Sequence, residues 1–427
     1  MSKNHGTVEM KGTILIIDPV LTGTKIAQEA KRRGFNTTAV IAWREIPSFA
    51  KNTFSRELYD EVLELEDADD LGELISSKVK SGKIRAVFPG TESAVELAER
   101  ARALLGFKTN NPGSTQLRRN KYRMHMALRK SGLRIPAQIE ASSFEEILGW
   151  IEKDSGNEIS WPVVVKPLQS AGTDGLSFSS DLGELRRHAE SILASRDMFG
   201  NPNTKILAQS FVPGTEYVVN TISSDGRHRI TDFWRYTKRT VPGAGMIYDR
   251  QDLLPVSDCS RLGIQDYVFR ALDSLEVRFG PAHSEVMMTG NGPVLIETAS
   301  RIQGGINTEL LDACTGTNQL SAAFDVALNE SAFDGIRVNE AKLNSHACWI
   351  NLICGESARV RKLSDFQEKI RALKSCFSLY VSVKEGQLIP KTIDLMSCPG
   401  VVFLMHDNPG QIEDDYLALR KLEKEHY

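Results

Sequence analysis

Short apolar runs alternate with amphipathic stretches in the first part of the chain. Thr13–Ile17 is continuous and β-branched, as in strands buried on both faces of a parallel sheet. The segment from Lys25 to Arg33 has helical periodicity and is followed by Gly34, a common residue after a last helical turn. The same alternation predicts strands at Thr37–Ala42 and Ala86–Phe88 and helices at Leu71–Ser81 and Ser93–Leu105. This order predicts a doubly wound α/β domain.

A turn cluster at Asn110–Gly113 predicts a domain boundary near residue 111. After it, Asn120 is a candidate N-cap for a helix that ends at Gly132. The next region mixes predicted helices at Ser142–Lys153 and Ile264–Leu275 with strands at Trp161–Val165, Lys205–Gln209, Tyr217–Ile222 and Arg229–Trp234. From about Ser345 we expect strands at Cys348–Cys354, Leu379–Val383 and Val401–Met405 and helices at Ser364–Leu373 and Gln411–Lys424. The chain therefore reads as α/β and α+β multidomain, divided at 1–111, 112–330 and 331–427.

Composition narrows the class of protein. The chain has 427 residues, of which 41% are hydrophobic and 25% charged, enough apolar material to exclude disordered and fibrous classes. Lysine and arginine total 52 against 55 acidic residues, a net charge of −3 that predicts no overall attraction to nucleic acid or an anionic membrane. No apolar run approaches the roughly 18 residues that a membrane helix needs. We expect a soluble, cytoplasmic, multidomain globular protein.

Several common sites are excluded by their missing motifs. The first strand is followed by Asp18–Gly23, which lacks the G-x-G-x-x-G of a dinucleotide site, and no P-loop motif occurs. The N-terminus, Met1–Lys11, is polar and has no signal-peptide core. The cysteines are sparse and never spaced C-x-x-C, so we expect reduced thiols rather than disulfides or a zinc site. They are Cys259, Cys314, Cys348, Cys354, Cys376 and Cys398.

The most informative stretch is a predicted β-hairpin around the turn Gly290–Gly292. If the turn is centred on Asn291, antiparallel pairing places Glu285 directly opposite Glu297. Opposed like charges destabilise a sheet unless something compensates them, and a divalent cation is the simplest compensation. The alternative is a solvated outer face with unrelated charges, since a slip of one residue would separate the carboxylates.

Alternation along the two strands assigns the remaining hairpin residues to two faces. The glutamate face also receives His283, Met287, Leu295 and Arg301. The opposite, apolar face receives Val286, Met288, Val294 and Ile296. The hairpin is therefore predicted to carry one core face and one face with two carboxylates, a histidine and an arginine.

Two lysines upstream could serve such a metal site. Lys166 follows the apolar run Trp161–Val165 and precedes the glycine-containing stretch Gln169–Gly175. Such a loop can turn backbone N–H groups toward a phosphate, and a lysine supplies a point charge. Lys121 lies in the first turn of a predicted helix, where a cation opposes the helix dipole unless it faces an anion. Taken singly, each feature is more typical of an ordinary surface.

A third element runs from Leu207 to Tyr217. A strand ends, passes through a short apolar link, turns at Pro213-Gly214 and restarts at Glu216. The backbone of the link could contact a purine edge, and the carboxylate could accept hydrogen bonds from ribose hydroxyls. The alternative is an ordinary connection between strands.

The order and spacing of these pieces are more specific than any one of them. Lys121, Lys166 with its loop, Gln209 to Glu216, and then Glu285, Glu297 and Arg301 together resemble the ATP-grasp fold. The resemblance runs from about Gly12 to Asn329 and includes a Rossmann-like domain in front of the ATP-grasp domain. The Phe88–Glu92 loop of that first domain is similar to the substrate-side loop of the superfamily.

Within the superfamily, the chain is most similar to carboxylate–amine ligases of the L-amino-acid ligase branch, which includes bacilysin-synthetase-like dipeptide ligases. The segments that carry this resemblance are Ala282–Glu285 and Glu297–Gly305. The tail from about Ser345 resembles the C-terminal α+β subdomain of the same branch.

The resemblance implies a role for each residue. Lys121 and Lys166 would contact the phosphates of ATP, and Ser170, Gly172 and their neighbours to Gly175 would close over them. The adenine would be lined by Gln209, Ser210, Phe211 and Val212, and Glu216 would hold the ribose. Glu285 and Glu297 would bind Mg²⁺, Arg301 would steady the transferred phosphoryl group, and Glu92 would face the substrate.

Two positions depart from the common pattern of the superfamily. Gln209 stands where many members have glutamate, which weakens the predicted side-chain contact to adenine. Ala299 replaces an asparagine metal ligand, a change that the dipeptide-ligase branch shares.

The implied reaction is amide-bond formation between two amino-acid-like substrates, plausible in peptide-antibiotic or other specialised biosynthesis. ATP would phosphorylate a carboxylate, an amine would attack the acyl phosphate, and ADP and phosphate would leave. Such chemistry needs positioning and charge neutralisation rather than a protein nucleophile, and a mobile lid, about 161–212, to exclude water. His283 could help deprotonate the amine or could simply hydrogen-bond Glu285.

Other readings stay open on the sequence alone. A primary-metabolism ATP-grasp enzyme, such as a carboxylase subunit or a purine-pathway ligase, is one, and a non-catalytic nucleotide-binding module is another. Gly304 and Gly305 would let a substrate approach the backbone and leave room for a bulky acyl donor, although a plain turn would use them equally. We expect a homodimer, the commonest oligomer among soluble proteins.

Overall fold

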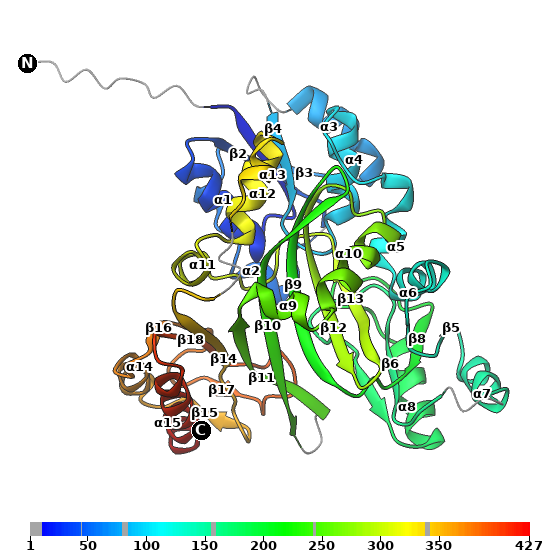
Figure 1. Cartoon of the computed structure of the whole chain (residues 1–427), viewed down its shortest axis with the longest axis vertical. Coiled ribbons are helices and arrows are strands. Elements are labelled where there is room, and N and C mark those ends of the chain that lie inside the picture. Colours follow the sequence, from blue (N-terminus) through cyan, green and yellow to red (C-terminus); the bar gives the residue numbers. More distant parts are fainter. Residues whose placement is uncertain (1–10, 44, 79–83, 155–158, 242–244, 338–341) are drawn as a thin grey trace, which may run out of the picture.

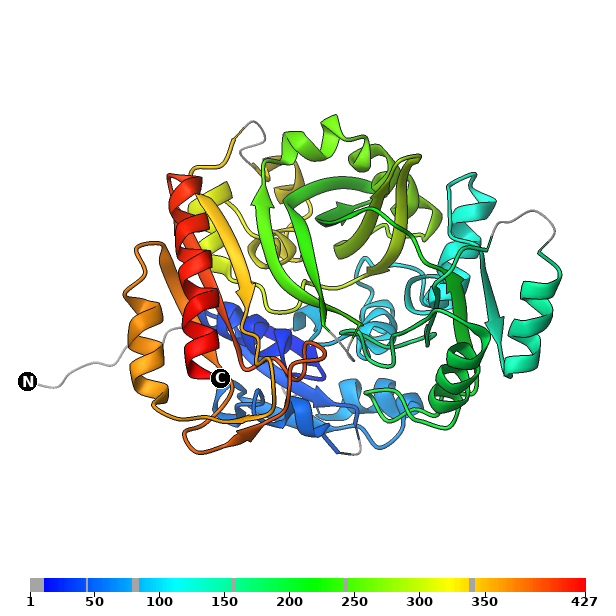
Figure 2. The same ribbon diagram turned by 90° about the horizontal axis from the view of Figure 1, so that it is seen from below.

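Three main β-sheets organise the chain in a computed structural model that describes residues 11–43, 45–78, 84–154, 159–241, 245–337 and 342–427. Figure 1 shows them as an N-terminal α/β unit, a long curved central sheet and a small sheet beside α7 and α8. Figure 2 shows the N-terminal domain beneath the curved sheet, with the C-terminal helices on one side and the small sheet on the other. No described helix has the length and apolarity that crossing a bilayer would demand.

The N-terminal domain is a four-stranded parallel sheet in the order β3-β2-β1-β4. Its strands are β1 (Thr13–Ile17), β2 (Asn36–Ile41), β3 (Glu61–Glu64) and β4 (Ile84–Pro89). Its helices are α1 (Thr22–Arg32), α2 (Ser48–Lys51), α3 (Leu71–Lys78) and α4 (Val95–Leu104). The predicted alternation is confirmed, although α1 begins three residues before the predicted Lys25. The end of the helix predicted to Ser81 lies outside the described residues.

Asp18 is buried at the end of β1, 1% exposed, where it accepts hydrogen bonds from the Ala42 N–H and the Ser93 hydroxyl. Burial raises the pKa of Asp18 from 3.8 to about 6, because it outweighs the two hydrogen bonds, which lower this pKa. Because the native state holds this proton more tightly, the contribution of Asp18 to stability is greatest below pH 4. We expect it to fall by roughly 3 kcal/mol as the pH rises from about 4 to 6.

Replacing Asp18 by asparagine keeps an acceptor for Ala42 and removes the titration. The urea midpoint of Asp18→Asn should therefore rise relative to that of the wild type between pH 4.5 and pH 7.5. A difference between the two proteins that does not change with pH would show that Asp18 has an ordinary pKa.

The small sheet of the middle region is antiparallel, in the order β5-β8-β6-β7. It contains β5 (Gln138–Ala141), β6 (Val163–Pro167), β7 (Ser177–Ser179) and β8 (Ile206–Ser210) and is flanked by α7 (Phe144–Glu152) and α8 (Leu182–Leu193). Two helices precede this sheet in the chain, α5 (Gln116–Arg119) and α6 (Lys121–Lys130). Asn120 caps α6 as predicted, because its side chain accepts a hydrogen bond from the Arg123 N–H. Because β6 extends to Pro167, Lys166 lies inside this strand and not just after it, as the predicted strand Trp161–Val165 implied.

The central sheet has eight antiparallel strands in the order β13-β12-β9-β10-β11-β14-β18-β16. The middle region supplies β9 (Thr215–Ser224), β10 (Arg227–Val241), β11 (Gly245–Leu254), β12 (Gly280–Thr289) and β13 (Gly292–Ala299). The last part of the chain supplies β14 (His346–Asn351), β16 (Cys376–Val381) and β18 (Gly400–His406). Three strands of the segment predicted as a C-terminal subdomain therefore extend the sheet of the middle region.

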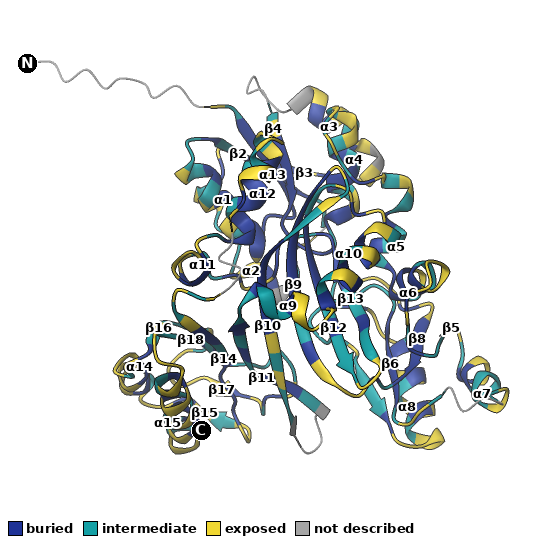
Figure 3. Ribbon diagram, viewed as in Figure 1, coloured by how far each residue is buried: buried dark blue, intermediate teal, exposed yellow. Residues whose placement is uncertain are grey.

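The remaining elements cover this sheet. Helices α9 (Val256–Arg261), α10 (Ile264–Ser274), α11 (Thr308–Thr315), α12 (Gln319–Leu328) and α13 (Ala332–Gly335) belong to the middle region. The C-terminal part adds α14 (Leu363–Arg371), α15 (Pro409–His426) and the small pair β15 (Ala358–Arg359) and β17 (Leu388–Ile389). Figure 3 shows buried residues along the strands and exposed residues on the outer helices. The aromatic pair Phe88 and Phe324, with ring centroids 4.6 Å apart, joins the N-terminal domain to α12.

Candidate active site

A cavity of about 1200 Å³ lies where the N-terminal domain, the two sheets of the middle region and the C-terminal strands meet. Eight of the predicted site residues line it: Lys121, Lys166, Ser170, Gly172, His283, Glu285, Glu297 and Arg301. Gly304 and Gly305 line it as well. Residues spread over almost two hundred positions of sequence therefore converge on one space. A cavity of this size can hold a nucleotide and further small molecules.

The hairpin β12–β13 places its two glutamates as predicted. Glu285 and Glu297 are register partners, and the side chains of both line the cavity. A β-bulge then shifts the register, so that Val286 pairs with Leu295 rather than with Ile296. The extra residue reverses the alternation on β13, which corrects the predicted faces. Leu295 is buried in the core and Ile296 lines the cavity, the opposite of the prediction.

Lys121, Lys166 and Glu297 form a buried group of charges. The Lys121 Nζ lies 2.8 Å from the Glu297 Oε2 and donates to the Ser170 carbonyl at 2.8 Å. Burial would raise the pKa of Glu297, but Lys121, Lys166 and Arg301 outweigh it and hold that pKa at about 2. Burial, and then repulsion by Lys121, lowers the pKa of Lys166 to about 8. The carboxylates around Lys121 and Lys166 therefore do not fully compensate the two positive charges, as expected of an anion-binding site.

The loop after β6 folds over these lysines. Its backbone passes through three left-handed residues, Gly172, Thr173 and Gly175, with φ of 65°, 66° and 65°. The Ser170 hydroxyl donates to the Asp174 carboxylate at 2.7 Å, and that carboxylate also accepts from the Met198 N–H at 2.8 Å. The loop thus has a defined shape beside the cationic end of the cavity, which suits a phosphate group.

Arg301 is held by Glu92 of the N-terminal domain. The Arg301 Nε and the Arg119 Nη1 each lie 2.8 Å from a different oxygen of Glu92. Burial would raise the pKa of Glu92, but the two arginines lower it below its usual range. Glu92 does not line the cavity among the described residues; it orients Arg301, which does. The resemblance assigned both residues to the substrate side of the site but did not indicate this contact, which joins positions 209 residues apart.

His283 is part of a hydrogen-bonded network behind the glutamates. Its Nδ1 lies 2.8 Å from the Asn220 Oδ1, while the Asn220 amide group donates to Asp232 and Gln303. Because Asn220 offers an acceptor to the ring, the Nδ1 carries the proton. The Nε2 then faces Glu285, 3.7 Å from its Oε1. The sequence alone did not indicate Asn220 or Asp232.

The residues predicted to bind adenine and ribose lie apart from the cavity that most of the other predicted site residues line. Gln209, Ser210, Phe211, Val212 and Glu216 lie outside the lining of this cavity. They form the crossing between β8 of the small sheet and β9 of the central sheet. The N–H groups of Ser210 and Phe211 donate to the carbonyls of Ala137 and Pro162, so they are not available to a base.

Two buried oxygens beside this crossing lack partners. The Gln209 Oε1 and the Glu216 Oε1 have no hydrogen-bond partner among the described residues. The other oxygen of Glu216 pairs with the Lys238 Nζ at 2.5 Å. Burial, partly offset by Lys238, raises the pKa of Glu216. These unsatisfied acceptors are compatible with donors on a ligand.

Among the cavity residues that were not predicted as site residues are two tyrosines and a lysine of the central sheet. Tyr236, Lys238 and Tyr248 line the cavity from β10 and β11. The Lys238 Nζ lies 4.5 Å from the centre of the Tyr248 ring. The other cations of this strand do not join Lys238 in the cavity lining. Arg235 and Arg239 pair instead with Asp252 and Asp249.

The space expected beside Gly305 is occupied. Gly305 has a left-handed φ of 69°, and a Cβ there would lie 2.3 Å from the Trp349 Cη2. The indole of Trp349 on β14 therefore occupies the space that a side chain at position 305 would take, while Gly305 itself lines the cavity. Gly304 has no such neighbour, so its side of the turn is open.

Comparison with known proteins agrees with this geometry. The family model for the ATP-grasp domain matches residues 159–309, which include β6, β7 and β8 of the small sheet, β9 to β13 of the central sheet and all the cavity residues of the hairpin. A dapdiamide A synthase from Enterobacter agglomerans is 31% identical over 358 residues, 83% of each chain. The chain is an ATP-grasp ligase. The resemblance and the fold class predicted from the sequence are thereby confirmed.

Two further proteins support the same assignment. The L-arginine-specific L-amino acid ligase of Bacillus subtilis is 22% identical over 263 residues, 58% of this chain and 59% of that one. The crystal structure of an L-amino acid ligase from Bacillus licheniformis superposes with a TM-score of 0.76 at 20% identity, covering 97% and 98% of the two chains. This ATP-grasp ligase is accordingly an ATP-dependent enzyme of the amide-bond-forming class.

Proposed function

We propose that the enzyme joins the carboxylate of one amino-acid-like substrate to the amine of another through an acyl phosphate, releasing ADP and phosphate. The observation that carries this proposal is the convergence of Lys121, Lys166, Glu297 and Arg301 at one end of a single large cavity. Two lysines and an arginine can neutralise a phosphoryl group in transfer. The rest of the cavity leaves room for two small molecules beyond the phosphates.

Glu285 and Glu297 fit a magnesium site completed by nucleotide phosphates. They are register partners on the cavity wall, and Glu297 stays ionised at any working pH. Among the described residues, no group of three or more His, Cys, Asp or Glu side chains is arranged to hold a metal. Magnesium often binds through only one or two carboxylates together with substrate phosphates. Bound there, it would supply charge neutralisation for the β- and γ-phosphates.

Each group of site residues would then have its own role in the reaction. Lys121 and Lys166 bind the phosphates, with the loop from Ser170 to Gly175 closing over them. Arg301, oriented by Glu92, meets the developing acyl phosphate. At the crossing between β8 and β9, the unpartnered Gln209 Oε1 and Glu216 Oε1 would accept hydrogen bonds from the adenosine. The His283 Nε2 faces the proposed metal side of the cavity, where it is placed to take part in proton transfer, and Asn220 orients the ring.

Phosphate release over a grid of amino acids tests this proposal. Pairs of amino acids are incubated with ATP and Mg²⁺, phosphate is measured, and products are identified by mass spectrometry. We expect phosphate release that requires both partners of at least one pair, with a product lighter by one water than their sum. Release that depends on bicarbonate or on a nucleotide intermediate would instead identify a carboxylase or a purine-pathway ligase. ATP binding with no turnover for any pair would indicate a non-catalytic module.

A further inference from the structure

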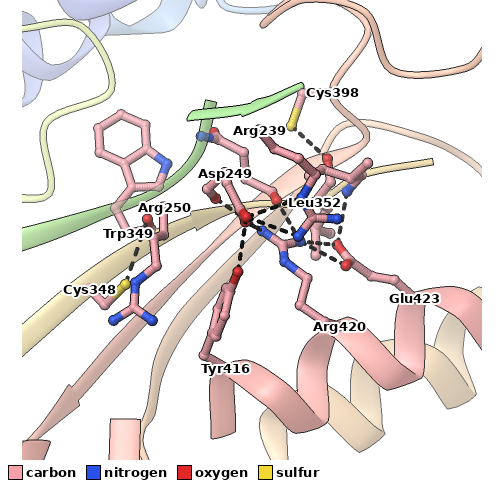
Figure 4. Close-up of polar contacts among 12 residues, drawn as sticks. Arg239, Asp249, Arg250, Cys348, Trp349, Leu352, Cys398, Tyr416, Arg420 and Glu423 are labelled. Atoms are coloured by element: carbon pink, nitrogen blue, oxygen red, sulfur yellow. Dashed lines mark hydrogen bonds and ion pairs between the residues drawn. The ribbon is translucent and has the colours of Figure 1, made fainter. Parts of the chain in front are cut away.

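Strands β14, β18 and β16 have one face against α14 and α15 and the other toward the cavity. Ile350 and Val402 belong to a buried core that includes residues of both helices. Figure 4 shows Arg420 and Glu423 reaching from α15 to these strands, while Trp349 projects away from that helix. Because neighbouring residues of a strand point to opposite faces, Trp349 and the residues in register with it belong to the cavity face.

Two rows of side chains run across these three strands on the cavity face, and both rows line the cavity. The first row is Trp349, Phe403 and Ser378, and the second is Asn351, Val401 and Tyr380. None of the described residues after position 345 that line the cavity is charged. This wall is therefore uncharged and largely apolar, in contrast to the end of the cavity that holds the lysines and glutamates.

Four large hydrophobic side chains of the cavity lining are exposed to solvent. Phe377, Tyr380 and Met396 are 36%, 61% and 52% exposed, and Leu21 of the N-terminal domain is 40% exposed. All four line the same cavity, so a molecule inside it can touch them. We call these four residues the apolar rim. Exposed hydrophobic side chains along a cavity are typical of a ligand-binding surface.

Leu21 adopts a backbone conformation that leucine rarely takes. Its φ is 52° and its ψ is −113°, and its N–H donates to the Thr53 hydroxyl at 2.9 Å. A positive φ is costly for a residue with a bulky side chain, and strained residues of this kind cluster at ligand sites. Because the Leu21 side chain is exposed, packing in the core does not offset the cost. Contact with an apolar ligand would offset it.

A short segment connects the rim to the phosphoryl end of the cavity. It begins at Arg301, passes the open side of Gly304, and packs against Trp349 at the next glycine. At its end, the Asn307 Nδ2 donates to the Ser378 hydroxyl of β16 at 3.0 Å. Gly304 and Asn307, which both line the cavity, are three residues and therefore at most about 10 Å apart. A substrate bound along this segment would direct its side chain toward β16.

The nucleotide does not account for the rim. Its phosphates are assigned to Lys121 and Lys166, and its adenosine to the crossing from β8 into β9. In the order of the central sheet, β9 is five steps from β16. At about 4.8 Å per step this is roughly 24 Å along the sheet. The rim is therefore left for a second molecule in the same cavity.

We propose that Leu21, Phe377, Tyr380 and Met396 form a subsite for the apolar side chain of one of the two amino-acid-like substrates. The proposal rests on the proposed ligase function and adds the class of substrate, an amino acid with an aliphatic or aromatic side chain. Such a side chain covers exposed hydrophobic surface on the rim. A charged side chain would lose hydration beside a wall that offers it no counterion.

Calorimetric titration tests the subsite without turnover. The enzyme is loaded with the non-hydrolysable analogue AMP-PNP and Mg²⁺ and titrated with pairs of amino acids whose side chains have similar size but different polarity. The pairs are leucine and asparagine, methionine and glutamine, and valine and threonine. We expect the apolar member to bind at least tenfold more tightly than its polar partner in at least one pair.

The variants Leu21→Asn and Met396→Gln make two rim residues polar at similar volume, and asparagine tolerates the positive φ at position 21. Each should reduce the apolar preference at least threefold and leave the affinity for AMP-PNP unchanged. Leu417→Asn is the matched control, because Leu417 is 58% exposed on α15 and lies outside the cavity lining. It should keep the preference of the wild type. Substitutions at exposed positions rarely prevent folding, and if one rim variant fails to fold, the other carries the test.

A wild type that prefers the apolar member of no pair would overturn the subsite, as would a preference that survives in both folded rim variants. Rim variants that weaken both members of every pair equally would also overturn it, because the rim would then close the cavity without recognising the side chain. A clear preference in an enzyme that never releases phosphate would contradict only the ligase proposal.

Discussion

Replacing Glu297 by glutamine should lower the rate of phosphate release by about 10²–10³-fold at saturating substrate. Glutamine has the same shape but lacks the charge that the cationic surroundings hold at a pKa of about 2. Lys121 would lose its ion pair 2.8 Å away, and the proposed magnesium site would keep only Glu285. Steady-state phosphate release measured against Mg²⁺ concentration should also show a weaker apparent metal affinity.

Glu368→Gln is the matched control for this variant. Glu368 is an exposed residue of α14, far along the chain from the hairpin, and the same chemical change there should leave turnover unaltered. Circular dichroism establishes that both variants are folded. A folded Glu297→Gln enzyme with turnover within tenfold of the wild type would show that the glutamate pair does not serve phosphoryl transfer.

Replacing Lys166 by methionine should separate activity from stability. Lys166 is 7% exposed, and its pKa falls to about 8 because of burial and of Lys121. Removing a buried charge beside a like charge should leave the melting temperature unchanged or raise it. Turnover should nevertheless fall about 10²-fold, and the affinity for ATP should weaken, because a preorganised positive charge is lost from the phosphate site.

The exposed Lys424 of α15 provides the control, since Lys424→Met should change neither quantity. Thermal unfolding without ligand and phosphate release with ATP are measured on the same preparations. A Lys166→Met protein that loses stability and activity in proportion would assign Lys166 a structural role.

The sequence was sufficient where local rules act. The predicted pairing of Glu285 with Glu297 is confirmed, although the turn is the two-residue Gly290-Asn291, with Thr289 opposite Gly292, and the β-bulge supplies the shift that brings the two glutamates together. The N-cap at Asn120 follows from a side-chain preference that needs no tertiary information. The same preference at Asp181, Asn307 and Asn318, which cap α8, α11 and α12, could have revealed three helices that were not predicted.

The sequence was insufficient where distant segments decide the geometry. The bulge opposite Val286 adds one residue to β13, and simple alternation cannot show this, so Leu295 and Ile296 were assigned to the wrong faces. The pairing of β11 with β14 joins segments separated by almost a hundred residues. That pairing brings Trp349 against Gly305, a contact that neither segment indicates alone. Long-range strand pairing of this kind leaves little trace in the pattern of either strand alone.

Transfer of oxygen from substrate to phosphate tests acyl phosphate formation most directly. The amino-acid pair that gives the most phosphate release is used with ¹⁸O in the carboxyl group of the acyl donor, and the released phosphate is analysed by mass spectrometry. Phosphorylation of the carboxylate predicts one ¹⁸O atom in each phosphate formed. Phosphate without ¹⁸O, or ¹⁸O recovered in AMP, would contradict an acyl phosphate formed at Lys121, Lys166 and Arg301.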